Sequence, residues 1–182
     1  MREMKIPADR VGALVGKGGA SKKMLEERTG IKIDVSADGD VVIHDEAEGV
    51  EPINAVKILD VIRAIGRGFN PDKAMKILDD DDMYLQTIDI KEAVGDRDNQ
   101  VARARGRLIG RKGRTRELIE ELADVYMSVY GNTVSLIGNS VSLPIASTAV
   151  EMLLHGSEHS TVYHYLESQR PRLRIAEMGF DL

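Results

Sequence analysis

The 182-residue sequence contains no cysteine and no tryptophan, and aromatic residues make up only 4% of it. Without cysteine there is no disulfide framework, no thiol nucleophile and no cysteine-ligated zinc site. The scarcity of aromatic residues argues against the stacking platforms on which RRM and OB modules bind bases. No apolar run approaches the roughly 18–20 residues of a membrane span, and the N-terminal MREMKIPADR lacks the apolar stretch of a secretory signal. We therefore expect a soluble, cytoplasmic protein.

The net charge of −5 hides two strongly basic stretches. Residues 102–116 contain seven basic residues and no acid, and residues 10–23 contain four basic residues and no acid. The acids gather elsewhere, above all in the run Asp79–Asp82. Because salt screens charges beyond about 8–10 Å, a polyanion responds to local clusters rather than to the total charge. Nucleic acid therefore remains open as a partner.

The chain consists of two copies of one unit. The segment GALVGKGG at residues 12–19 aligns without a gap with GRLIGRKG at residues 106–113. Downstream, MLEE at 24–27 matches LIEE at 118–121, and each copy continues with an apolar run, a tight turn, a second apolar run and a Pro-Ile pair. Chance would not reproduce this order, so we treat the sequence as a tandem repeat.

Each copy predicts the same order of elements, β-α-α-β-β-α. Residues 3–7 and 84–90 have the character of short strands. We expect Asp9 to be the N-cap of the first helix in copy one, and Asp98 or Asn99 in copy two. Both helices should end at a glycine in a left-handed C-terminal cap, at residues 16 and 110.

Apolar spacing predicts the buried face of the later helices. In the second helix of each copy, this face comprises Met24, Leu25 and the stem of Arg28, or Leu118, Ile119, Leu122 and Ala123. In the third helix, which has proline in its first turn, it comprises Ile53, Val56, Leu59, Ile62 and Ile65, or Ile145, Ala149, Met152 and Leu153. A short helix follows each copy, over 72–78 with Asn70-Pro71 as its cap, and over 159–166. We expect domains at 1–78 and 84–182, joined by a solvated acidic linker at 79–83.

The two Gly-x-x-Gly segments, residues 16–19 and 110–113, are suited to bind an anion. They bring backbone N–H groups to the start of a helix, and glycine lets a phosphate approach closely. The first turns of these helices carry Lys22 and Lys23, or Arg114 and Arg116, where acids are normally preferred. A bound phosphate backbone would reverse the cost of that arrangement, and the arrangement occurs twice.

These loops and their flanks resemble the KH domain, a single-stranded nucleic-acid module whose GxxG loop clamps about four nucleotides. Thr29-Gly30 before the strand is also typical of KH sequences. The resemblance implies an α+β fold of two tandem type I KH domains, each a three-stranded antiparallel sheet with helices packed on one face. Both copies depart from the family in one respect, because Lys22 and Arg116 stand where an isoleucine is usual.

A closer resemblance covers nearly the whole chain. The paired KH units, GRLIGRKGRT at 106–115 and the closing His159-x-x-x-Tyr163-x-x-Leu166-Glu167 resemble archaeal two-KH proteins of small-subunit ribosome assembly. Those proteins are similar to the eukaryotic "partner of Nob" pre-rRNA processing factor. The resemblance implies binding of single-stranded (pre-)rRNA near the 3′ end of small-subunit rRNA. It also implies contact with the endonuclease that trims this end and with the alpha subunit of an archaeal initiation factor.

Resemblance and charge together give one set of candidate RNA-binding residues. It comprises Gly16, Lys17, Gly18, Gly19, Lys22, Lys23, Arg105, Arg107, Gly110, Arg111, Lys112, Gly113, Arg114 and Arg116. The strand residues Ile33, Val35, Met127 and Val129 either wall the groove that takes the bases or belong to the core. Copy two has the denser positive charge and is the better candidate for the main site.

Other classes of function find less support. There is no P-loop, no complete dinucleotide fingerprint and no acid–base pair or triad, so we expect no catalytic residue and no cofactor. The four histidines, His44, His155, His159 and His164, lack the spacing of a metalloprotease helix, and we expect no metal. The serious alternative is an assembly or translation-initiation adapter whose KH folds bind protein and little RNA. A KH copy that has lost RNA binding should also have lost the basic residues of its loop. Both copies keep them.

Overall fold

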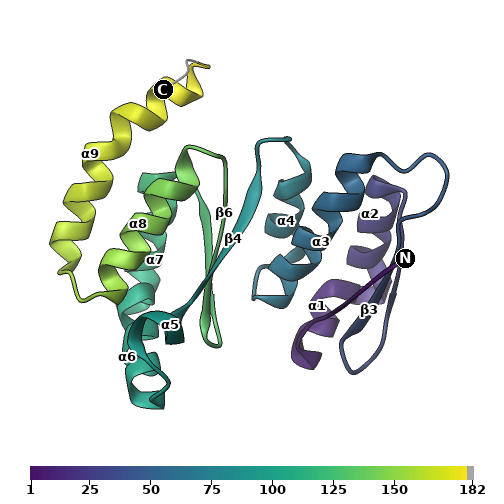
Figure 1. Ribbon diagram of the computed structural model, residues 1–182, viewed down its shortest axis with the longest axis horizontal. Helices are drawn as coiled ribbons and strands as arrows, with labels where there is room; N and C mark the ends of the chain where they lie inside the picture. The colour runs from purple at the N-terminus through teal and green to yellow at the C-terminus, as the bar shows by residue number, and fades with distance from the viewer. Residues whose placement is uncertain (180–182) are drawn as a thin grey trace. The chain divides into compact units, whose positions relative to one another are not determined.

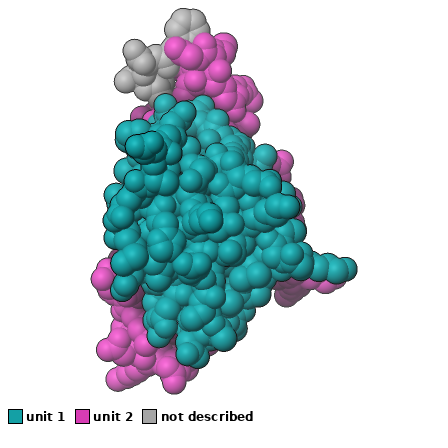
Figure 2. Space-filling model, turned by 90° about the vertical axis from the view of Figure 1, so that its right-hand side faces the viewer, with its two compact units in different colours: residues 1–83 teal, residues 84–182 magenta. Residues whose placement is uncertain are grey.

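Each copy of the repeat folds into a three-stranded antiparallel sheet with helices on one face (Figure 1). The computed structural model describes residues 1–179 and divides the chain into two units, residues 1–83 and 84–182 (Figure 2). The central strand in each unit is the last one in sequence, with orders β1-β3-β2 and β4-β6-β5. The predicted α+β architecture is confirmed in both copies.

The first unit has ten short elements. They are β1 (Arg2–Lys5), the 3-10 helix η1 (Ala8–Arg10), α1 (Val11–Val15), the 3-10 turn η2 (Lys17–Gly19), α2 (Ala20–Thr29), β2 (Lys32–Val35), β3 (Asp40–His44), α3 (Pro52–Gly66), α4 (Pro71–Ala74) and η3 (Met75–Leu78). Ile43 of β3 pairs with Ile33 of β2, and both side chains are fully buried against the helices. Leu14 and Leu25 reach the same core from the two helices that flank the glycine loop.

The second unit repeats this plan with longer strands, a longer helix before the glycine loop and one added helix, α5. They are β4 (Tyr84–Asp89), α5 (Ile90–Val94), α6 (Asp98–Ile109), the 3-10 turn η4 (Arg111–Gly113), α7 (Arg114–Ala123), β5 (Tyr126–Tyr130), β6 (Thr133–Gly138), α8 (Ser142–Leu154) and α9 (His159–Glu177). Helix α9 lies along α7 and α8 (Figure 1). Among residues 1–179 no helix combines the length and hydrophobicity needed to cross a bilayer.

The predicted N-caps of the first helices are wrong. Asp9 lies inside η1, which follows Pro7, and Asp98 is in the first turn of α6 after Arg97. In copy two the chain first forms α5, whose N-cap Asp89 accepts a hydrogen bond from the Lys91 amide at 2.9 Å. An acid in the first turn still complements the helix dipole, so both acids mark a helix start, although Asp9 lies two positions after the N-cap and Asp98 one position after it. The predicted cap at Asn70 forms, with its side chain accepting from the Lys73 amide at 2.8 Å.

The predicted apolar stripe of α3 is only half right. Ile62 and Ile65 are buried, but Ile53 and Val56 are 41% and 56% exposed. Residues spaced by three shift about 60° around a helix at each step, because a turn takes 3.6 residues. A stripe written with that spacing therefore drifts away from the core. In α2 the same applies to Met24, which is exposed, while the buried positions are Leu25 and Thr29, four residues apart.

Helix α9 is much longer than the helix expected over 159–166. It runs for 19 residues and includes Pro171. Leu173 is 3% exposed and extends the apolar contact made by Val162 and Leu166. The Arg170 side chain donates to the Leu122 carbonyl of α7 at 3.2 Å. The burial of Leu173 keeps the chain helical beyond the proline.

A buried lysine secures the end of the first unit. Lys57 of α3 is only 6% exposed, and its ammonium donates to the carbonyls of Ile77 (2.8 Å), Met83 (3.3 Å) and Asp80. All three ammonium protons thus have acceptors, as burial of a charge requires. The four residues of the acidic run, Asp79–Asp82, are exposed. Asp79 pairs with Arg28, and that hydrogen bond lowers the pKa of the Asp79 carboxyl.

Candidate nucleic-acid interface

The first glycine of each loop is required by packing. Gly16 and Gly110 have φ of 76° and 75°. A Cβ atom there would lie 2.3 Å from the Ser21 hydroxyl oxygen and 2.2 Å from the Thr115 hydroxyl oxygen, respectively. Their ψ values of 172° and 175° lie outside the left-handed helical region, so the predicted left-handed cap is wrong, although the positive φ was expected. Both loops therefore turn back tightly onto the start of the following helix.

The third residue of each loop has a left-handed backbone, but only copy one places a glycine there. Gly18 has φ 61° and Lys112 has φ 54°. The left-handed region costs a residue with a side chain roughly 1–2 kcal/mol. The Lys112 side chain is exposed, so no packing within the unit offsets this cost. Backbone strain that the fold does not need points to a function for the side chain.

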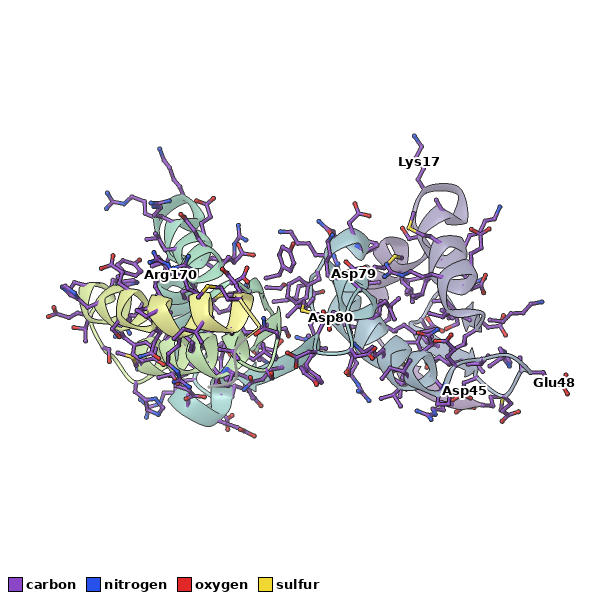
Figure 3. All side chains as sticks on the ribbon, turned by 90° about the horizontal axis from the view of Figure 1, so that it is seen from above. Lys17, Asp45, Glu48, Asp79, Asp80 and Arg170 are labelled. Atoms are coloured by element: carbon purple, nitrogen blue, oxygen red, sulfur yellow. The ribbon has the colours of Figure 1, made fainter. Side chains whose placement is uncertain are left out.

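The loop cations are free of acids. Lys17, Arg111 and Lys112 are exposed, and within residues 1–179 none of them has an ion pair or a side-chain hydrogen bond. Figure 3 shows Lys17 projecting from the turn between α1 and α2 into solvent. Neither loop is buried and neither is covered by carboxylates, so both are open to an anion.

The cations of the next helical turn are paired with glutamates on their own helices. The pairs are Lys22–Glu26 (3.4 Å), Lys23–Glu27 (3.9 Å), Arg114–Glu117 (3.9 Å) and Arg116–Glu120 (2.6 Å). The pairs Lys23–Glu27 and Arg114–Glu117 are exposed, and exposed pairs contribute only about 0.2–1 kcal/mol each. A phosphate group can therefore displace these two glutamates at little cost, whereas Lys22–Glu26 and Arg116–Glu120 are partly buried.

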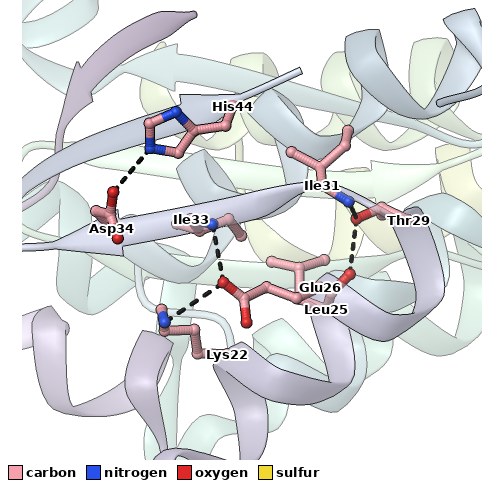
Figure 4. A network of polar contacts seen from close by, with 8 residues as sticks. All are labelled: Lys22, Leu25, Glu26, Thr29, Ile31, Ile33, Asp34 and His44. Carbon is pink, nitrogen blue, oxygen red and sulfur yellow. Dashed lines mark hydrogen bonds and ion pairs between the residues drawn. The ribbon is translucent and has the colours of Figure 1, made fainter. Parts of the chain in front are cut away.

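Two of these glutamates have a second role, which is the same in both copies. Glu26 accepts a hydrogen bond from the Ile33 amide at 2.9 Å while it pairs with Lys22 (Figure 4). Glu120 likewise accepts from the Met127 amide at 3.1 Å and pairs with Arg116. Each carboxylate thus joins a loop-helix cation to the edge strand. The lysine and arginine that replace the usual isoleucine are held in place by this contact.

Arginine side chains support the helix that follows each sheet. In the first unit, Arg10 donates to the carbonyls of Ile65 and Phe69 near the end of α3, both at 2.8 Å. In the second unit, Arg107 donates to the carbonyls of Leu153 and Ser157 at the end of α8. A cation there satisfies carbonyls and complements the helix dipole. The structure thus places the Arg107 guanidinium on protein carbonyls, although the sequence had placed this arginine among the RNA-binding residues that flank the second loop.

The other predicted residues divide between site and core. Arg105 is half-buried, and its Nε atom has no partner within the described residues. Ile33 and Met127 are 0% and 3% exposed, so these two are core residues rather than groove walls. Val35 and Val129 are partly buried on the same sheet faces. Within residues 1–179, His, Asp and Glu form no group of three that could hold a metal ion.

A hollow lies beside the second loop, and it was not predicted from the sequence. It has a volume of about 470 Å³ and is lined by Arg103, Arg107, Arg111, Arg114, His159 and Tyr163, among others. Arg103 and Arg107 lie four residues apart on one face of α6, a spacing that the sequence did contain. The two aromatic residues come from α9, far along the chain, and no local pattern places them here.

Comparison with known proteins agrees with this architecture. Residues 84–171 match the model of the "Eukaryotic type KH-domain (KH-domain type I)", and residues 1–52 match that of the KH domain. A KH domain-containing protein of Methanocaldococcus jannaschii is 43% identical over 173 residues, which cover 95% of this chain and 75% of that protein. The chain belongs to this KH-domain family. The family also includes the Schizosaccharomyces pombe pre-rRNA-processing protein pno1, 26% identical over 96% of this chain and 73% of its own length.

Solved structures of the family have the same fold over nearly the whole chain. Dim2p from Pyrococcus horikoshii is 43% identical, with a TM-score of 0.85 over 92% of this chain and 98% of that one. A second structure from that organism, of an a/eIF2alpha–aDim2p–rRNA complex, contains a chain 42% identical with a TM-score of 0.88, covering 94% of each chain. Both glycine loops therefore lie in a fold that this chain shares with its relatives, some of which are named as pre-rRNA-processing proteins.

Proposed function

We propose that this chain binds single-stranded RNA through its two glycine loops, with the second loop as the main site. The RNA is (pre-)rRNA near the 3′ end of the small-subunit rRNA. The observation that carries the proposal is Lys112, an exposed, unpaired cation in a backbone conformation that its counterpart Gly18 adopts without strain. The relative solved together with rRNA supports the choice of ligand.

The contacts follow from the charges around each loop. Glycine backbone amides of residues 16–19 and 110–113 hold the sugar-phosphate chain at the start of a helix. Lys17, Arg111 and Lys112 meet phosphate directly, because no carboxylate competes for them. The paired cations Lys22, Lys23, Arg114 and Arg116 exchange their glutamates for neighbouring phosphates. Arg105 and Arg107 add positive charge beside the second loop.

A second function accompanies the first. We infer that the same protein serves as an adapter that contacts the alpha subunit of an initiation factor, and the relative solved in a complex with a/eIF2alpha favours this. The endonuclease that trims the rRNA 3′ end remains a proposed partner from the family resemblance. Crosslinking in the cell tests the RNA assignment, with crosslinks expected at the small-subunit rRNA 3′ region. Crosslinks spread evenly over other RNAs would contradict it.

Exchange of residues between the two loops tests the role of Lys112. Lys112→Gly gives the second loop the residue that copy one has, so the fold should be unaffected, while affinity for single-stranded RNA should fall about three- to tenfold. The reciprocal Gly18→Lys should raise the affinity, since Lys112 shows that this backbone accepts lysine. Fluorescence anisotropy with a labelled oligonucleotide measures both. Equal affinities in all three proteins would contradict direct binding by this residue.

Neutralising Glu120 should strengthen binding. Glu120→Gln keeps an oxygen for the Met127 amide but removes the charge that competes with phosphate for Arg116. We expect an affinity gain of about two- to fivefold, which corresponds to the loss of one partly exposed ion pair that competes with phosphate. Glu121→Gln on the same helix removes an equal charge from an exposed side chain that has no ion pair within residues 1–179, and it serves as the control. A lower affinity in Glu120→Gln would show that the carboxylate positions Arg116 for binding rather than competing with RNA.

A further inference from the structure

The hollow beside the second loop has the composition of a nucleotide site. It lies between the end of α6, the start of α7 and the first turns of α9, all within the second unit. Strand residues such as Met127 and Val129 were expected either to wall the base groove or to belong to the core, whereas this hollow has α9 as its wall. Arg107, Arg111 and Arg114 already belong to the proposed loop site, whereas Arg103, His159 and Tyr163 are lining residues that the two-loop proposal does not use.

The hollow is positively charged throughout. Four arginines line it, and none of its lining residues is acidic. Arg103 and Arg111 are exposed, and within the described residues they have no ion pair. The Arg114–Glu117 pair is long, at 3.9 Å. Arg103 and Arg111 are thus available for a phosphate group, while Arg107 contributes charge from its fixed position.

Aromatic rings complete the hollow. The Tyr163 hydroxyl lies 3.1 Å from the Thr115 hydroxyl, which is buried beneath the loop. The His159 Nε2 atom lies 2.9 Å from the Arg107 carbonyl oxygen, and since a carbonyl only accepts, Nε2 carries the proton. The two ring centroids are 6.2 Å apart. Both rings are held by hydrogen bonds and only half-buried, so they offer fixed faces for a base.

One glycine in the wall has no role in the fold. Gly106 lies within α6 with ordinary helical backbone, and a Cβ atom there would meet nothing within 4 Å. Glycine inside a helix costs about 0.5–1 kcal/mol relative to alanine. The absent side chain leaves the wall of the hollow open to a ligand that approaches the helix backbone.

Copy one lacks this site. The residues aligned with Arg103, Arg107 and Arg114 are Asp9, Ala13 and Ala20. The short helix α4 that follows the first copy packs on α3. The feature is therefore an addition to the second unit and not a general property of the repeat.

We propose that this hollow binds one nucleotide of the RNA strand as the strand passes the second loop on the side of α9. Arg103 and Arg111 bind its phosphate, and the rings of Tyr163 and His159 contact its base. The inference rests on the proposed RNA binding by the loop and extends the bound strand beyond it. The hollow suits a ligand that has an anionic group next to a flat ring. A nucleotide has both.

Two variants test the hollow without disturbing the loop. Gly106→Leu fills the open wall with a better helix former, and Arg103→Glu reverses an exposed charge. The probes are labelled oligouridylates of about four nucleotides, the length that a GxxG loop holds, and of about eight nucleotides. Both variants should weaken binding of the longer RNA about tenfold and leave the shorter one within about twofold. Arg97→Glu, an exposed arginine at the start of the same helix, is the charge-matched control and should behave like wild type.

The outcomes separate this inference from the function on which it rests. If the wild-type protein binds neither oligonucleotide, the proposed function fails. If it binds both lengths equally and the variants change nothing, only the hollow is overturned as an RNA site, and an acidic protein segment becomes the ligand to test. Equal weakening of both lengths by Gly106→Leu would also overturn it, because the hollow would then be part of the loop site.

Discussion

Replacing Arg111 and Lys112 together with aspartate should weaken binding of single-stranded RNA by at least about tenfold. The two cations carry no ion pair within the described residues, so the substitution replaces direct phosphate binding with repulsion. Aspartate tolerates the left-handed backbone of residue 112 better than most residues, which protects the loop geometry. A plot of the logarithm of affinity against the logarithm of salt concentration should also become less steep. Its slope should decrease in magnitude by about 0.7 for each phosphate that the variant no longer neutralises. Anisotropy titrations at several salt concentrations measure both effects.

A matched double reversal separates local contacts from net charge. Arg172 and Arg174 lie exposed near the end of α9, and their replacement with aspartate changes the total charge by the same amount. We expect that variant to bind RNA within about twofold of wild type, since charges beyond the screening length contribute little. Unchanged binding in the loop variant itself would favour the adapter function over RNA binding.

The Lys57→Met substitution should lower the free energy of unfolding of the first unit by about 2–4 kcal/mol. Methionine has a similar length and fits the apolar part of the site, but it cannot donate to the carbonyls of Ile77, Asp80 and Met83. These acceptors would all be left without their donor, at the point where the chain leaves the unit. Urea denaturation followed by circular dichroism measures the decrease.

The control for Lys57 is the same substitution on an exposed lysine. Lys23→Met breaks only a long surface pair with Glu27 and should cost less than about 0.5 kcal/mol. If Lys57→Met lowered the free energy of unfolding as little as Lys23→Met does, water would be able to replace the ammonium as hydrogen-bond donor to the three carbonyls. The hydrogen bonds of Lys57 would then contribute nothing specific to the end of the unit.

The features that could be predicted from sequence are those fixed by local chemistry. The repeat, the glycine turns and the Asn70 cap follow from backbone conformations that few residues satisfy. Asp9 and Asp98 marked the helix starts to within a residue or two. In the second unit, however, the acid that caps a helix is Asp89, at the start of the additional helix α5. Helix boundaries depend on where the following chain packs, and the sequence signal does not contain that information.

The features that could not be predicted depend on residues far apart in sequence. Arg107 belongs to a basic cluster by sequence, but its partners are carbonyls at the end of α8. Lys57 is charged and would be assigned to the surface, although it is buried because distant carbonyls accept all its protons. The hollow needs His159 and Tyr163 of α9, which contact Arg107 and Thr115 far back along the chain. Charge and periodicity indicate which residues are unusual, whereas only the tertiary fold shows what they contact.

The steric requirement at the first loop glycine affects how related sequences should be interpreted. A side chain at Gly16 or Gly110 would collide with the next helix whether or not RNA is present. Natural selection for folding alone would therefore retain this glycine in a descendant that no longer contacts nucleic acid. The two residues between the glycines face no such constraint, and their charge is the better marker when active and silent members of the family are sorted.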